Sequence, residues 1–140
     1  MQDFSQRLII VARKDLPGWQ FANAVAHVSA FVGNKLGDSF GTGKYFTSKD
    51  KVNFPRNSQY PIIIKRAGSD EQLKNLFERV KVTNILHYVF IREMIDHTND
   101  EDLQRALESK DVKDIEFLAV GVFGPNDEVS ALTKKFGLWE

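Results

Sequence analysis

A short apolar run near the start of the chain, ended by charge and followed by a helical pattern, constrains the fold more than any other feature. Leu8–Ala12 is apolar throughout, Arg13–Asp15 is charged, and Pro17–Gly18 marks a turn. A strand that leads directly into a helix is typical of an α/β protein, in which ligands bind where the carboxyl end of a strand meets a helix N-terminus. The polar residues near this junction are therefore the first site candidates. They are Arg13, Lys14, Asp15, Gln20, Asn23 and His27.

The segment from Trp19 to Leu36 has the periodicity of an amphipathic helix. Its apolar residues recur three and four positions apart, which places them on one face. Asn23 and His27 are four residues apart and share a second face. A third stripe consists of small residues that allow a neighbouring surface to approach closely. It contains Ala22, Ala26, Ser29 and Gly33.

The rest of the chain alternates between strand and helix patterns. Further strands are predicted over residues 60–65, 84–91 and 115–123, and further helices over residues 69–80, 98–108 and 127–136. Ser69 is the predicted N-cap of the first of these helices, and Thr98 or Asn99 is the predicted N-cap of the second. The order of elements predicts one α/β sandwich domain around a small, mostly parallel sheet.

A long connection over residues 37–58 separates the first helix from the second main strand. It is rich in Gly, Lys, Ser and Asn, and it predicts a short strand at Lys44–Thr47. Lys44 follows several glycines, as in a phosphate-binding loop, but Asp38 stands where that motif needs its first glycine, and Tyr45 where it needs Ser or Thr. We therefore interpret this connection as a loop that is either functional or mobile.

The charge balance disfavours a nucleic-acid-binding protein. Nineteen basic and nineteen acidic residues give a formal net charge of +0, so only local clusters can attract a polyanion. Residues 1–7 lack the pattern of a signal peptide, no apolar run is long enough to cross a bilayer, and Cys is absent. We expect a cytoplasmic protein without membrane association or disulfides. The basic clusters are Arg13–Lys14, the group Lys44, Lys49, Lys51 and Arg56, and Lys65–Arg66.

Glu93, at the end of the strand predicted over residues 84–91, is a second site candidate. Together with Arg92 it is either a carboxylate delivered to a site or one half of an exposed ion pair. If this strand neighbours the first strand, Lys14, Asp15 and Glu93 converge on one cleft.

Histidine and metal chemistry has little support in the sequence. His27 is either a hydrogen-bonded residue that holds its helix to the sheet or a general base. Glu93, Asp96 and His97 are close in sequence, but the three histidines lack the spacing of known metal-binding motifs. We expect neither a metal nor a cofactor.

Several short motifs follow one another in an order that resembles a known family. They are Val11–Leu16, Asn23–His27, Ile62–Lys65 with Asp70–Leu73, Val120–Pro125 and Phe136–Trp139. The chain resembles the type two peptidyl-tRNA hydrolases, and more closely the uncharacterised bacterial relatives of that fold, a domain of unknown function. The resemblance implies a single three-layer α/β/α domain over residues 1–140 with a four-stranded mixed sheet.

The resemblance also implies how a reaction site is arranged. The family cleaves the ester between peptide and tRNA with a lysine at the start of its first helix and an aspartate after its third strand. Gln20 and Glu93 stand at these positions, and Met94–His97 replaces a stretch that contains threonine. A neutral amide cannot take the part of a cation, so the resemblance implies an altered activity.

We expect a protein of unassigned activity that binds a small polar or anionic ligand between the first strand, the first helix and the strand over residues 84–91. Two alternatives remain open: a peptidyl-tRNA hydrolase-like esterase, with tRNA a disfavoured partner, and a homodimeric interaction module that uses the small stripe and Leu138–Trp139. The predicted catalytic residues are Glu93, Lys14 and Gln20, and the predicted ligand-binding residues are Arg13, Asp15, Asn23, His27 and Arg92.

Overall fold

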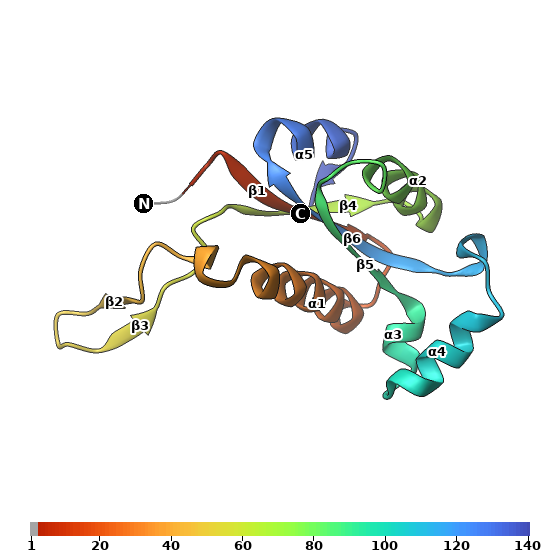
Figure 1. Cartoon of the computed structure of the whole chain (residues 1–140), viewed down its shortest axis with the longest axis horizontal. Coiled ribbons are helices and arrows are strands. Elements are labelled where there is room, and N and C mark those ends of the chain that lie inside the picture. Colours follow the sequence, from red (N-terminus) through yellow and green to blue (C-terminus); the bar gives the residue numbers. More distant parts are fainter. Residues whose placement is uncertain (1–2) are drawn as a thin grey trace.

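Five strands form the main sheet of the protein (Figure 1): β1 (Gln6–Arg13), β4 (Ile62–Ala67), β5 (Leu86–Ile91), β6 (Phe117–Pro125) and β7 (Gly137–Leu138). The strand order is β5, β6, β1, β4, β7. β1 and β4 are parallel, whereas the other neighbouring pairs are antiparallel. This computed structural model describes residues 3–140. Met1 and Gln2 belong to residues 1–7, which lack the sequence pattern of a signal peptide, and they lie outside the described residues.

The sheet is mixed, as the family resemblance implies, but it is neither four-stranded nor mostly parallel. All four predicted strands are present, and the fifth, β7, pairs with β4 through two residues, too few to show a periodic pattern. β6 lies between β1 and β5 and runs antiparallel to both. An apolar run indicates a strand but not its direction, so the sequence pattern did not reveal this reversal.

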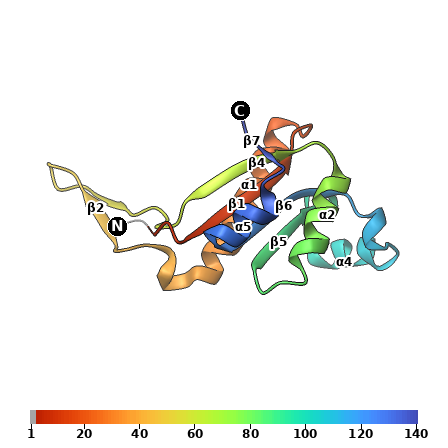
Figure 2. The same ribbon diagram turned by 90° about the horizontal axis from the view of Figure 1, so that it is seen from above.

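Helices cover both faces of the sheet and so form three layers. α1 (Gly18–Leu36) lies on one face, and α2 (Asp70–Val80) and α5 (Asn126–Thr133) lie on the other (Figures 1 and 2). Alternate residues of β1 enter the two cores, since Leu8 and Ile10 pack on the α1 side and Ile9 and Val11 on the opposite side. Burial on both faces explains why this strand is a continuous apolar run.

α1 approaches β6 closely because Gly121 has no side chain. A Cβ at this position would lie 2.2 Å from Cγ1 of Val28, far inside van der Waals contact. Val28 is completely buried on α1, so the helix has no room to yield at this point. Gly121 therefore sets the distance between α1 and the sheet.

Both predicted N-caps are found. Ser69 Oγ accepts a hydrogen bond from the backbone N–H of Gln72 at 3.3 Å, and Asn99 caps α4 (Asp100–Glu108) in place of Thr98. The sequence does not predict α3 (Arg92–Asp96), because five residues are too few to show a helical period. None of the described helices combines the length and the apolar composition needed to cross a bilayer.

The long loop folds into an arm that projects from the rest of the molecule (Figure 1). After the short 3-10 helix η1 (Gly37–Phe40), β2 (Tyr45–Thr47) pairs antiparallel with β3 (Asn53–Pro55) in a separate sheet. The predicted strand at Lys44–Thr47 is thereby confirmed, but it does not join the main sheet.

Candidate ligand-binding site

Polar residues gather at the edge of the sheet where β1 and β5 end and β6 begins. β1 and β5 both run antiparallel to β6, so their carboxyl ends lie at the same edge as the start of β6. Arg13 ends β1, Arg92 follows β5, and Glu116 directly precedes β6. This edge is where α/β proteins commonly place their ligands.

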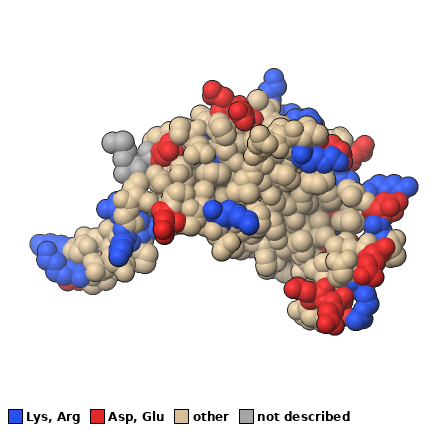
Figure 3. All heavy atoms as spheres, in the orientation of Figure 1, with Lys and Arg blue, Asp and Glu red and all other residues tan. Residues whose placement is uncertain are grey.

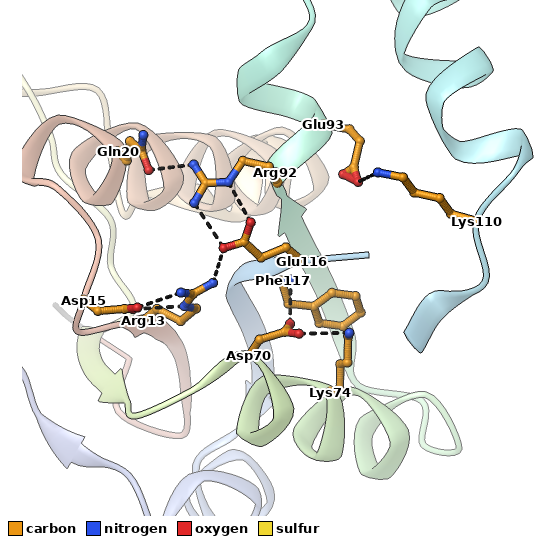
Figure 4. A network of polar contacts seen from close by, with 10 residues as sticks. All are labelled: Arg13, Asp15, Gln20, Asp70, Lys74, Arg92, Glu93, Lys110, Glu116 and Phe117. Carbon is orange, nitrogen blue, oxygen red and sulfur yellow. Dashed lines mark hydrogen bonds and ion pairs between the residues drawn. The ribbon is translucent and has the colours of Figure 1, made fainter. Parts of the chain in front are cut away.

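Glu116 accepts hydrogen bonds from both arginines (Figure 4). Arg13 Nη1 donates to Glu116 Oε1 at 2.5 Å, and Arg92 donates through Nε to Oε2 at 2.9 Å and through Nη2 to Oε1 at 3.2 Å. Arg13 also donates to the carboxylate of Asp15 through Nε at 3.0 Å and Nη2 at 2.7 Å. We call the set of Arg13, Asp15, Arg92, Glu116 and Gln20 the edge network.

Gln20 joins the edge network from α1. Arg92 Nη1 donates to Gln20 Oε1 at 2.7 Å, so the neutral amide at this position is an acceptor for a cation. Each arginine thus uses three of its five N–H donors within the described part of the chain. The other N–H groups are available to water or to a ligand.

The hydrogen bonds of the edge network stabilise the charged forms of its carboxylates and guanidinium groups. The hydrogen bond from Arg92, aided by the bond from Arg13 and opposed by partial burial, lowers the pKa of Glu116 to about 2. The hydrogen bond from Arg13 likewise lowers the pKa of Asp15, and the two carboxylates raise the pKa of the arginines. Two positive and two negative charges therefore cancel near neutral pH, and Glu116 is unsuited to transfer a proton there.

α2 holds the start of β6 beside this network. Asp70 Oδ1 accepts a hydrogen bond from the backbone N–H of Phe117 at 2.7 Å, and Asp70 Oδ2 lies 2.9 Å from Lys74 Nζ (Figure 4). The backbone N–H of Arg92 donates to the carbonyl of Glu116 at 3.0 Å. The position of Glu116 is therefore fixed through its backbone as well as its side chain.

A pocket of about 270 Å³ lies between α1, β5 and the α3–α4 segment. His27 reaches it from α1 and stacks on Phe90, with ring centroids 5.0 Å apart. His97 lies at the C-terminal end of α3, and Asp100 at the start of α4. The remaining lining residues are Tyr88, Met94, Thr98, Asn99 and Leu103.

One face of α1 runs from the edge network to this pocket. Gln20, Asn23 and His27 are three and four residues apart and therefore share a face of the helix. Asn23 is exposed and lines a shallow hollow with His27. This face of α1 thus carries the amide of Gln20 at the edge network and the imidazole of His27 at the pocket, with the amide of Asn23 between them.

Glu93 is buried and points away from the edge network (Figure 4). It is only 3% exposed, and its Oε1 accepts a hydrogen bond from Lys110 Nζ at 3.2 Å. Its Oε2 is buried without a hydrogen-bond partner among residues 3–140. A buried carboxylate with one unsatisfied oxygen is costly, so the single contact with Lys110 matters for stability.

The structure therefore brings four of the eight predicted site residues into one network: Arg13, Asp15, Gln20 and Arg92. Lys14 is exposed, and its backbone N–H donates to the carbonyl of Ala67 at 3.0 Å. The condition for Lys14, Asp15 and Glu93 to converge is not met, because β6 separates β1 from β5.

Sequence reasoning missed Glu116 and the contribution of His97 to the pocket. Glu116 stands directly before a strand, so the same criterion that selected Arg13 and Glu93 at strand ends selects it once the direction of β6 is known. Among the residues that the structure describes, no three His, Asp or Glu side chains are grouped closely enough to hold a metal ion.

The fold and the edge network define a three-layer α/β protein whose two central arginines share one carboxylate at the carboxyl edge of the sheet. The chain belongs to the family described as "Protein of unknown function (DUF2000)", whose pattern matches residues 6–140. Its fold is similar to a solved structure of a protein of unknown function, Atu0240, from Agrobacterium tumefaciens strain C58. The two share 18% identity with a TM-score of 0.85, covering 99% of this chain and 100% of that chain. No curated protein matches the chain.

Proposed function

We propose that the protein binds a small polar or anionic ligand in the pocket between α1, β5 and the α3–α4 segment. The observation that carries this proposal is the convergence of polar side chains from three elements on one concave, partly apolar surface. Ligand sites typically combine an apolar lining with a few polar groups that fix orientation. Here Phe90, Met94 and Leu103 supply the apolar part, and His27 and His97 are the central polar groups.

The polar groups favour a ligand with hydrogen-bond acceptors. Each imidazole can donate one N–H when neutral and two when protonated. The start of α4, where Thr98 and Asn99 line the pocket, adds the positive end of a helix dipole, although Asp100 offsets part of it. The volume of about 270 Å³ lies at the lower limit of common ligand pockets, which indicates a small molecule.

The edge network supports the pocket by fixing its walls. Gln20 belongs to the helix that carries His27, and Arg92 begins the short helix that carries Met94. Their hydrogen bond of 2.7 Å therefore links the two walls near one end of the pocket. We assign Gln20 and Arg92 a positioning role in ligand binding.

Nuclear magnetic resonance of the imidazole groups tests this function directly, because the chain has only three histidines. His87 provides an internal control: its ring lies against Phe77 on the face of the sheet opposite to His27. We choose benzoate and benzamide as probes, since they have the same shape and differ in charge. Binding in the pocket shifts the signals of His27 and His97 and leaves His87 unchanged.

A stronger response to benzoate than to benzamide supports an anionic ligand, and the reverse supports a neutral one. His27→Ala and His97→Ala should each weaken the response of the remaining pocket histidine, whereas His87→Ala should not. The proposal is wrong if millimolar benzoate and benzamide leave His27 and His97 no more shifted than His87.

The contacts of Glu93 and Gln20 bear on the esterase alternative. Glu93 bonds Lys110, and Gln20 bonds Arg92, so the two residues have different partners on different elements. We therefore favour binding over hydrolysis. A peptidyl-tRNA assay distinguishes them: turnover that is lost in Glu93→Gln, a variant of nearly the same shape, supports the esterase instead.

A further inference from the structure

The arm formed by β2 and β3 carries an apolar face that is open to solvent. Phe46 and Phe54 are directly opposite each other in the two strands, so their side chains lie on the same face. They are 52% and 56% exposed, and Val52, two residues before Phe54, is exposed as well. An isolated two-stranded hairpin is marginally stable in water. The arm therefore has the properties of a contact element.

The arm is also basic. Residues 42–58 contain four basic residues and one acidic residue. Lys49 and Lys51 lie between the two strands at the tip, and they are exposed. Arg56 lies over the ring of Phe46, 4.5 Å from its centroid, and so covers part of the apolar face with positive charge. A partner for this arm must offer negative charge beside an apolar surface.

The opposite end of the molecule is acidic. Residues 96–114, which include α4, contain seven acidic and three basic residues. Figure 3 shows acidic side chains at this end and basic side chains at the tip of the arm. Because the net charge of the chain is +0, this separation of charge makes the two ends of the molecule complementary.

Both ends project on the same side of the molecule, the side that α1 covers, and the outline between them is concave (Figures 1 and 3). If a second copy turns by half a rotation and faces this side, the arm of each copy meets the acidic end of the other. The two α1 helices then face each other antiparallel across the space that the concave outline leaves between them.

We propose that two copies of this chain form a two-fold dimer in which the basic β2–β3 arm of each protomer lies against the acidic α4 end of its partner. The contact is isologous, so each dimer forms two identical arm contacts. Asp100 and Leu103 belong to the acidic end and also line the pocket, so the partner's arm lies near the mouth of the pocket. The dimer does not depend on the identity of the ligand.

Solution mass and a charge exchange test the dimer. The full chain should have the mass of a dimer at low salt and shift toward the monomer as salt rises, because exposed charges are screened. Lys49→Glu with Lys51→Glu should halve the mass at low salt. Glu101→Lys with Glu108→Lys should do the same, since these two residues are seven apart and share one face of α4. All four substitutions in one chain should restore the dimer.

Lys134→Glu with Lys135→Glu is the matched control. It changes the net charge as much as the arm variant does, but these exposed residues follow α5 on the other side of the sheet. It should leave the dimer intact. Phe46→Ser with Phe54→Ser should halve the mass without changing any charge, and circular dichroism verifies that each variant remains folded.

Three outcomes overturn the proposal. The first is a wild-type chain that is monomeric at low salt and high concentration. The second is a chain with all four charge substitutions that stays monomeric, although each pair of substitutions alone has broken the dimer. The third is a mass greater than that of two copies, which indicates an open head-to-tail array. A monomer whose arm binds single-stranded RNA, and loses that binding in Lys49→Glu with Lys51→Glu, assigns the arm to nucleic acid instead.

Discussion

Gln20 on α1 accepts a hydrogen bond from Arg92, which lies 72 positions further along the chain and begins α3. This bond extends the edge network from the sheet to the helix that carries His27. The same guanidinium bonds Glu116, so one side chain joins α1, the end of β5 and the start of β6. The edge network therefore connects the elements that form the walls of the pocket.

Replacing Glu116 with Gln should weaken the edge network. The amide keeps the shape of the side chain but removes the carboxylate that the two guanidinium groups share, so Arg92 loses its carboxylate partner and Arg13 keeps only Asp15. Glu116 is 38% exposed, so water replaces part of the lost contacts, and we expect a loss of about 1 kcal/mol in the free energy of unfolding. Urea denaturation measures it. Glu140→Gln, which changes an exposed carboxylate outside the helices, should cause no measurable loss.

The edge network should also make the stability of the protein depend on pH in the acid range. The pKa of Glu116 is about 2 in the folded state, below its ordinary value of 4.5. Glu116 therefore stabilises the folded state above pH 4.5 and loses this contribution as pH falls toward 2. The difference in unfolding free energy between wild type and Glu116→Gln should therefore be constant above pH 5 and shrink below pH 4. A difference that grows as the solution is acidified contradicts this assignment.

Gly121→Ala should destabilise the protein by overpacking the contact between β6 and α1. The added methyl group meets Val28 Cγ1 at 2.2 Å, and such overpacking costs about 1–3 kcal/mol. Gly124→Ala is the control in the same strand, since its Cβ would meet nothing closer than 3.6 Å. Val28→Ala should recover part of the loss when it is combined with Gly121→Ala. Thermal unfolding of the four variants measures this coupling.

Lys110→Met should destabilise the protein because it leaves the buried carboxylate of Glu93 without its ion-pair partner. Breaking a buried pair from one side costs about 3–5 kcal/mol, and we expect less, about 1–3 kcal/mol, because Lys110 is itself 39% exposed. Glu93→Gln should recover part of this loss in the Lys110→Met background, since it removes the unpaired charge. Denaturant unfolding of both single variants and the double variant gives the comparison. Additive losses contradict a direct pair.

The sequence predicts the long elements of this fold and the short strand β2, but it misses the short elements β3, β7 and α3. β1 and α1 are long enough for their apolar patterns to be distinctive, and Ser69 and Asn99 have strong cap preferences. β7 and α3 contain two and five residues, so no period can emerge from them. The antiparallel direction of β6 depends on how the α3–α4 segment returns the chain, which no local pattern encodes.

The candidate site shows the same division. Polar residues at strand ends and helix starts meet at one edge of a sheet, which predicts a site that contains Arg13, Asp15, Gln20 and Arg92, and the structure joins these four residues. Their common partner, Glu116, depends on strand order, because β6 must lie between β1 and β5 to place a carboxylate between two arginines. The same argument predicts Lys14 and Glu93 as site residues, but the side chain of Lys14 is exposed to solvent and that of Glu93 is buried in the protein.

The central position of β6 has a consequence for how this chain folds. Within residues 3–140, β5 pairs with β6 alone, so a nascent chain that ends before Glu116 holds β5 unpaired and lacks the carboxylate that Arg13 and Arg92 share. β1 and β4 can pair earlier, because both precede β5 in the sequence. The sheet is therefore completed by insertion of a late segment between two early ones, a non-local step that favours slow folding. Folding on the ribosome should stay incomplete until β6 (Phe117–Pro125) has emerged.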